Sequence, residues 1–328
     1  GKITMDFFLG VQLHFTINLK KYFEVPNGML HAVDDVNISI EKGSTLGVVG
    51  ESGCGKSTLG KTIMKLTQPT SGQICFEGVD IAPLSAAAFR PYRYQIQMIF
   101  QDPYATLDPR MSIAQLIAEP LEVSKTLTDR VQIDQRVDEL MDLVGLAKRL
   151  KNSYPHELDG GRRQRIGVAR ALALKPKFIV CDEPVSALDV SIQAQILNLL
   201  QDLQKDMGLT YMFITHDMSV VKHISNQIAV MYLGQVIETC EAKELFRNTL
   251  HPYSQALLSA IPVPSIHVQR KKILLKGELS SPINPKPCCR FAVRCPYATD
   301  ECFASEPEFR EITKGHCVAC HKVEEQQS

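Results

Sequence analysis

Residues 50–58 read Gly50-Glu51-Ser52-Gly53-Cys54-Gly55-Lys56-Ser57-Thr58 and fit the pattern G-x-x-x-x-G-K-[ST] at every fixed position. A short apolar run of strand type, 45–49, comes before them, and residues 59–66 continue with helical spacing. A glycine-rich turn before an ordinary helix is the simpler alternative, but strand, loop and helix are the context that a phosphate-binding loop requires. We therefore expect Lys56 to reach the β- and γ-phosphates of a nucleotide and Ser57 to bind Mg²⁺.

The composition is that of a globular protein. The chain has 328 residues, 45% of them hydrophobic, which is enough for one large domain and a smaller one. Its 36 basic and 36 acidic residues balance, which argues against a nucleic-acid-binding surface. No uninterrupted apolar stretch reaches the roughly 20 residues that span a bilayer, and residues 1–15 lack the layout of a cleavable signal. We expect a cytosolic protein.

The residues before the loop predict strands. Runs of β type cover 11–18 and 36–40, with a turn signal at 26–28 between them. We expect these strands to lie over the nucleotide. The adjacent aromatics Tyr22 and Phe23 could stack on a base or fill a core, and their spacing alone favours the core.

After the loop, an apolar run ends at Gln101. This glutamine is either a solvated strand end or a contact to Mg²⁺ or to an attacking water. Apolar residues at helical spacing between 112 and 150 then predict an inserted helical subdomain, bounded by prolines. Next, Asp159 is a good N-cap for a helix, and Gly160 and Gly161 would expose backbone N–H groups to a phosphate, although this pattern alone is weak evidence.

A second apolar strand, 178–182, ends in two carboxylates, those of Asp182 and Glu183. They could cap a helix, but with a phosphate loop upstream we expect Asp182 to bind Mg²⁺ through water and Glu183 to polarise the water that attacks the γ-phosphate. A helix from 190 to 206 and a strand at 210–214 follow, and the strand leads into His216. That histidine is either structural or catalytic.

Together these motifs resemble the nucleotide-binding subunit of an ABC transporter over nearly the whole chain. The matching motifs are Walker A at 50–58, the Q-loop at Gln101, the signature at 158–164, Walker B at 178–182 followed by Glu183, the D-loop at 186–189 and the switch histidine at His216. The resemblance implies ATP and Mg²⁺ as cofactors, with Mg²⁺ held by Ser57, Gln101 and Asp182, and catalytic roles for Glu183, Gln101 and His216.

The resemblance assigns further residues. It implies that the adenine stacks on Phe23, or on Tyr22 if the loop is offset by one residue. The signature residues Asp159, Gly160, Gly161 and Arg162 would act on the ATP of the opposite subunit, and Asp189 belongs to the D-loop. The chain departs from the family at two of these positions, since Asp159 and Arg162 stand where Ser and Gln are usual.

Three stretches, 100–104, 183–191 and 251–258, are similar to the dipeptide/oligopeptide permease ATPases. This implies import of di- or oligopeptides by a peripheral subunit at the cytoplasmic face of the membrane. Its implied partners are a second ABC ATPase, usually a different chain, two transmembrane permease subunits and an external binding protein, without nucleic acid. Close relatives carry nickel or sugars. A soluble ABC ATPase in DNA repair or translation is less favoured, because the chain has one cassette and an insert of ordinary length.

The expected fold is α/β, that of an ABC ATPase with a P-loop core, an antiparallel β subdomain and a helical subdomain at about 102–165. We expect a nucleotide-binding domain at 7–250 and a Cys-rich C-terminal extension at 251–328.

Six of the ten cysteines fall between Cys288 and Cys320, which in a reducing compartment suggests a metal more than disulfides. The resemblance implies a 4Fe-4S cluster on Cys289, Cys295, Cys302 and Cys320, with zinc as the alternative and Cys288 and Cys317 as spares. We expect a structural task, because the tail is poor in large apolar residues. A redox role is open.

Overall fold

The computed structural model describes residues 12–261, 273, 275, 277 and 281–326. The first residues of the expected nucleotide-binding domain, 7–11, lie outside this part. The chain divides into two compact units, one made of 1–82 with 213–328 and the other of 83–212. The chain passes from the second unit back to the first within strand β8 (Thr210–Thr215). No helix in the described part combines the length and apolarity needed to cross a membrane.

The first unit contains a four-stranded antiparallel sheet with the order β2-β1-β4-β5. Its strands are β1 (Gln12–Val25), β2 (Gly28–Glu41), β4 (Ser71–Phe76) and β5 (Val79–Asp80). Val36, Ile38 and Ile40 alternate with more exposed residues, so one face of β2 packs on the core. The two runs that we expected to be strands are therefore parts of a longer hairpin, and the Tyr22–Phe23 pair lies inside β1.

A second set of strands in the same unit runs in the order β11-β12-β10-β9-β3. The strands are β3 (Thr45–Val49), β9 (Gln227–Tyr232), β10 (Gln235–Glu241), β11 (Phe309–Thr313) and β12 (His316–Ala319). β3 pairs parallel to β9 and is buried along its whole length, as is typical of a parallel strand covered on both faces. The predicted strand before the phosphate loop is thus confirmed.

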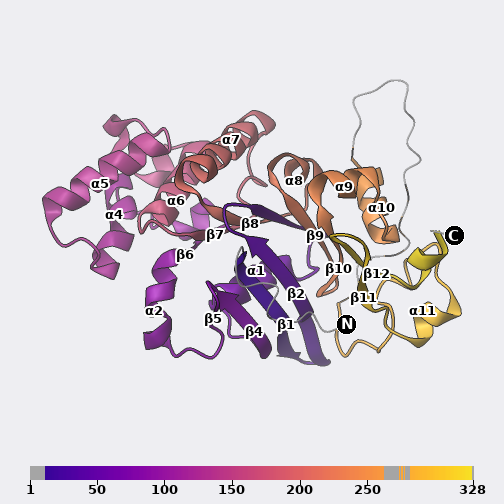
Figure 1. Cartoon of the computed structure of the whole chain (residues 1–328). Helices are drawn as coiled ribbons and strands as arrows, with labels where there is room; N and C mark the ends of the chain where they lie inside the picture. The colour runs from indigo at the N-terminus through magenta and orange to yellow at the C-terminus, as the bar shows by residue number, and fades with distance from the viewer. Residues whose placement is uncertain (1–11, 262–272, 274, 276, 278–280, 327–328) are drawn as a thin grey trace, which may run out of the picture. The chain divides into compact units, whose positions relative to one another are not determined.

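The helices of this unit connect and cover these strands (Figure 1). They are α1 (Lys56–Ile63), α8 (Met218–Ile224), α9 (Ala242–Arg247), α10 (Pro252–Ser259), α11 (Asp300–Ala304) and η4 (His321–Gln326). The C-terminal segment adds Phe291 to a buried cluster with Tyr232 and Tyr253. Our expectation that this segment needs a metal for its folding energy overlooked this shared core.

The second unit is mainly helical. Its elements are α2 (Ala86–Gln95), β6 (Ile96–Ile99), α3 (Pro103–Thr106), α4 (Ile113–Ser124), α5 (Arg130–Leu143), η2 (Lys148–Leu150), η3 (Pro155–Glu157), α6 (Gly160–Leu172), β7 (Phe178–Asp182) and α7 (Val190–Met207). Ser112 and Gln115 form a capping box that starts α4, and Asp129 caps α5. The helical spacing between 112 and 150 is confirmed by these two helices.

Candidate functional site

The phosphate loop connects β3 to α1 through glycines that no other residue could replace without strain. Gly50, Gly53 and Gly55 have φ values of 155°, 82° and 108°. A Cβ on Gly55 would lie 2.1 Å from the carbonyl oxygen of Ala32, and one on Gly50 would lie 2.3 Å from that of Met231. Among the described residues, no side chain caps the start of α1, so the N-terminus of this helix suits an anion such as a nucleotide phosphate.

Lys56 is the cation of this loop. Its side chain is buried, and its ammonium donates to the carbonyl oxygens of Gly50 at 2.8 Å and Glu51 at 2.9 Å. Ser57 and Thr58 are half-buried in the first turn of α1. Backbone donors, an ammonium and hydroxyls are the groups that hold a nucleotide triphosphate and its Mg²⁺. The residues present thus fit ATP and Mg²⁺.

The two aromatics expected near the base differ in their surroundings. The Tyr22 ring stacks on His31, with 3.8 Å between the ring centroids, and its hydroxyl donates to Asp34. Burial and this hydrogen bond raise the pKa of Tyr22. Phe23 is 36% exposed, and the ammonium of Lys21 lies 4.6 Å from its ring centre. Phe23 is therefore the accessible ring, and adenine stacking on it stays a prediction.

In the second unit, Gln101 and Glu183 meet at the ends of neighbouring strands. β6 and β7 are parallel, so the residues that follow them lie at the same edge. The side-chain amide of Gln101 donates to Oε2 of Glu183 at 3.0 Å. Asp182 and Glu183 are both buried, and Glu183 has a positive φ of 46°. Buried carboxylates beside an amide are suited to Mg²⁺ and to orienting a water.

The signature residues lie at the start of α6. Asp159 caps this helix, as predicted, by accepting from the backbone N–H of Arg162 at 2.8 Å. The other carboxylate oxygen of Asp159 lies 3.4 Å from Nε of Arg162. A Cβ on Gly161 would lie 2.6 Å from the side chain of Ile192, so the start of α7 packs against Gly161.

The D-loop and the switch histidine both precede helices. Asp189 caps α7 by accepting hydrogen bonds from the backbone N–H groups of Ser191 and Ile192. The pKa of Asp189 is lowered, mainly by the hydrogen bond from Ile192. His216 is exposed directly after β8, and its neighbour Asp217 caps α8. The roles of Asp189 and His216 in hydrolysis stay predictions.

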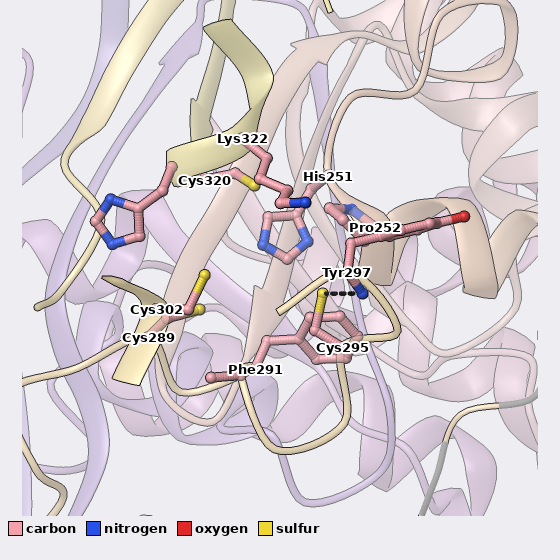
Figure 2. Close-up of a pocket in the computed structure, with 11 residues that line it drawn as sticks. His251, Pro252, Cys289, Phe291, Cys295, Tyr297, Cys302, Cys320 and Lys322 are labelled. Carbon is pink, nitrogen blue, oxygen red and sulfur yellow. Dashed lines mark hydrogen bonds between the residues drawn. The ribbon is translucent and has the colours of Figure 1, made fainter. Parts of the chain in front are cut away.

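The four cysteines expected to bind a metal line one cavity of about 20 Å³ (Figure 2). The four cysteines that the resemblance assigned to a metal, Cys289, Cys295, Cys302 and Cys320, therefore do lie around one cavity. However, among the residues that the structure describes, no group of three or more His, Cys, Asp or Glu is placed to hold a metal ion. The prediction of a 4Fe-4S or zinc site is wrong.

The size and contacts of this cavity differ from those of a metal site. Burial raises the pKa of Cys289 to about 12 and also raises those of Cys295 and Cys320, so these side chains are thiols here. Two sulfurs also have partners of their own, since Cys295 accepts from the backbone of Tyr297 and Cys302 pairs with the Thr299 hydroxyl. A cavity of this size holds about one water, which is far smaller than a four-iron cluster.

Two residues that the sequence did not single out contact the phosphate loop. Arg294 donates to both carboxylate oxygens of Glu51, at 2.6 and 3.0 Å. The hydroxyl of Tyr253 accepts from the backbone N–H of Glu51 at 2.8 Å. Neither contact follows from local spacing, because 243 and 202 residues separate the partners.

Two protein-family models match the chain. The ABC transporter model matches residues 33–186, and the model of the oligopeptide/dipeptide transporter C-terminal region matches residues 237–302.

Curated relatives match nearly the full length. The oligopeptide transport ATP-binding protein OppF of Salmonella typhimurium is 51% identical over 96% of this chain and 95% of its own. The putative oligopeptide transport ATP-binding protein YkfD of Bacillus subtilis is 50% identical over 95% and 93%.

The chain is also similar to solved structures. One is the ATP-binding cassette MJ0796 in a dimeric post-hydrolysis state bound to ADP and Pi. It has a TM-score of 0.65 and 28% identity, covering 70% of this chain and 99% of that one. Another is cbiO1 from Clostridium perfringens, with a TM-score of 0.65 and 29% identity over 73% and 92%.

Proposed function

The chain belongs to the family of ATP-binding proteins of oligopeptide-type ABC transporters, and we propose that it hydrolyses ATP to power the import of di- and oligopeptides through a membrane permease. One observation supports peptides as the substrate class. About half of the residues are identical, over almost the whole length, to proteins named for oligopeptide transport. The ATPase activity follows from the family and from a phosphate loop whose donors fit a nucleotide triphosphate.

Particular residues serve nucleotide binding, Mg²⁺ binding and the orientation of the attacking water. Lys56 and the backbone N–H groups of the phosphate loop bind the β- and γ-phosphates, and Phe23 stacks on the adenine. When bound, Mg²⁺ would neutralise phosphate charge, and Ser57, Asp182 and Gln101 would hold it. Glu183 accepts a hydrogen bond from the attacking water and orients it. Gln101 supports this role because its amide fixes the position of the Glu183 carboxylate.

The remaining motifs act between subunits. The chain pairs with a second ABC ATPase, usually a diverged homologue, and contributes Asp159, Gly160, Gly161 and Arg162 to the nucleotide of its partner. His216 contacts the γ-phosphate, and Asp189 lies at the junction of the pair. The relative MJ0796 supports such pairing, because its solved form is dimeric.

The assembly also includes two permease subunits and an external binding protein, with this chain on the cytoplasmic face of the membrane. Nickel or sugar import by the same machinery is the alternative. The match to the oligopeptide/dipeptide C-terminal region favours peptides.

Affinity purification from detergent-solubilised membranes, followed by mass spectrometry, tests this proposal. We expect two hydrophobic permease subunits, a second ABC ATPase and a peptide-binding protein among the partners. Recovery of ribosomal or DNA-repair proteins without any permease would contradict a transport role. Recovery of a nickel- or sugar-binding protein would replace the peptide as the cargo.

A further inference from the structure

The carboxylate of Glu51, the second residue of the phosphate loop, is held by the C-terminal extension. Arg294 donates from Nη1 and Nη2 to its two oxygens, at 2.6 and 3.0 Å. A two-point contact between guanidinium and carboxylate fixes orientation as well as distance, which a lysine cannot do. The Arg294 side chain is 8% exposed and that of Glu51 is 30% exposed, so water and salt reach the carboxylate and screen this pair in part.

The backbone of Glu51 is held by the same part of the molecule. Its N–H donates to the hydroxyl of Tyr253, whose side chain is fully buried. Tyr253 packs edge-on against Tyr232 and Phe291, with ring centroids 4.7 and 5.5 Å away. The anchor of the loop is therefore set in a rigid aromatic cluster.

Glu51 creates an electrostatic conflict that Arg294 resolves. The Lys56 ammonium lies in this loop, where it donates to the backbone carbonyl oxygen of Glu51, and its charge suits an anion. The side chain of Glu51 nevertheless adds a carboxylate to the same loop. A negative charge beside a polyphosphate opposes binding, most strongly where solvent is excluded. The guanidinium of Arg294, which belongs to the C-terminal extension, offsets the negative charge of the Glu51 carboxylate.

We propose that Arg294 is a positioning residue of the nucleotide site: it neutralises and orients Glu51, so that the phosphate loop accepts the β- and γ-phosphates of ATP. The C-terminal extension is then part of the nucleotide-binding machinery. This inference rests on the proposed function, because its readout is nucleotide binding.

Binding of MgATP to the purified full chain, measured by titration calorimetry, tests the inference. Arg294→Met is expected to weaken the affinity about tenfold at 0.1 M salt, with a smaller deficit at about 1 M salt, where screening is stronger. Adding Glu51→Gln to Arg294→Met removes the uncompensated carboxylate and is expected to restore affinity to within about threefold of wild type. Arg294→Lys, which keeps the charge, is expected to lie between wild type and Arg294→Met.

A matched control is Arg136→Met in the other unit: it removes another mostly buried arginine, paired with Glu139 at 2.9 Å and bonded to the carbonyl oxygen of Leu172, and should leave the affinity unchanged. If Arg294→Met does not fold by circular dichroism, Arg294→Gln carries the same comparison, since it keeps a hydrogen-bond donor and removes the charge.

Wild-type affinity in Arg294→Met would overturn the inference. So would a double variant no better than Arg294→Met, because a packing role alone predicts no rescue and no salt dependence. A wild-type chain that binds no MgATP would overturn the proposed function as well.

Discussion

Gln101 and Glu183, 82 residues apart in the sequence, are joined by a hydrogen bond of 3.0 Å from the amide of one to the carboxylate of the other. The bond connects the residues that follow two neighbouring parallel strands, β6 and β7. It holds the buried carboxylate that we assign to the attacking water. Two predictions follow from this pair.

Glu183→Gln is expected to retain MgATP affinity and to lose turnover by on the order of 100-fold or more, because an amide cannot act as a base towards water. The shape of the side chain and a hydrogen bond to Gln101 are both kept. Phosphate release by the assembled transporter measures the effect. Turnover near the wild-type value would mean that another group orients the water.

Gln101→Ala removes one donor from Glu183 and one expected ligand of Mg²⁺, but keeps the carboxylate itself. Turnover should therefore fall by about tenfold, less than in Glu183→Gln. The Mg²⁺ concentration that gives half-maximal rate should rise. An unchanged rate and Mg²⁺ dependence would assign Gln101 to the solvated end of its strand.

The signature substitutions Asp159 and Arg162 should act as a coupled pair. Their side chains are 3.4 Å apart and roughly half exposed, so we expect less than about 1 kcal/mol of coupling in the free energy of unfolding. Coupling in ATPase activity should be larger, because Asp159→Ser and Arg162→Gln each change the charge that reaches the partner's nucleotide. A double-mutant cycle on turnover measures it, and strictly additive effects would reject the pairing.

The phosphate loop should not tolerate a side chain at Gly55. Gly55→Ala places a Cβ 2.1 Å from a backbone oxygen, whereas Gly43, also at positive φ, has nothing within 4 Å of such a Cβ. Gly43→Ala is thus the matched control, with a conformational cost of about 1–2 kcal/mol. We expect Gly55→Ala to cost more than this in urea unfolding and to abolish MgATP binding. Equal costs and retained binding would show that the loop can shift.

His251 should make stability fall in mild acid. Burial lowers its pKa from 6.5 to about 4, so in the folded chain it stays neutral while the unfolded chain takes up a proton below pH 6.5. The free energy of unfolding should drop by about 2 kcal/mol between pH 7 and pH 5 from this group.

The His251→Asn variant is the comparison for this group. Asparagine keeps an N-cap for α10, whose start His251 now caps through Nδ1. Urea unfolding of both proteins at the two pH values gives the difference. An equally steep pH dependence in His251→Asn would assign the effect to other groups.

Residue type and strand order are enough to predict part of the candidate site from the sequence. The cap made by Asp159 follows from residue type, and the meeting of Gln101 with Glu183 follows from parallel strands ending at one edge. The contact between Arg294 and Glu51 could not be predicted, because it depends on how a distant segment packs. The resemblance indicated which four cysteines lie together, but it gave no geometry, and in the described residues these side chains do not form a metal-binding group.

Peptide uptake into proteoliposomes is the most direct test of the central claim. The chain would be reconstituted with its permease subunits, its second ATPase and the binding protein, with ATP on the side of the ATPases. We expect a labelled oligopeptide to accumulate only with ATP, and Glu183→Gln to abolish its accumulation while the complex stays assembled. Peptide accumulation that continues without ATP hydrolysis, or hydrolysis that no peptide stimulates, would contradict the account.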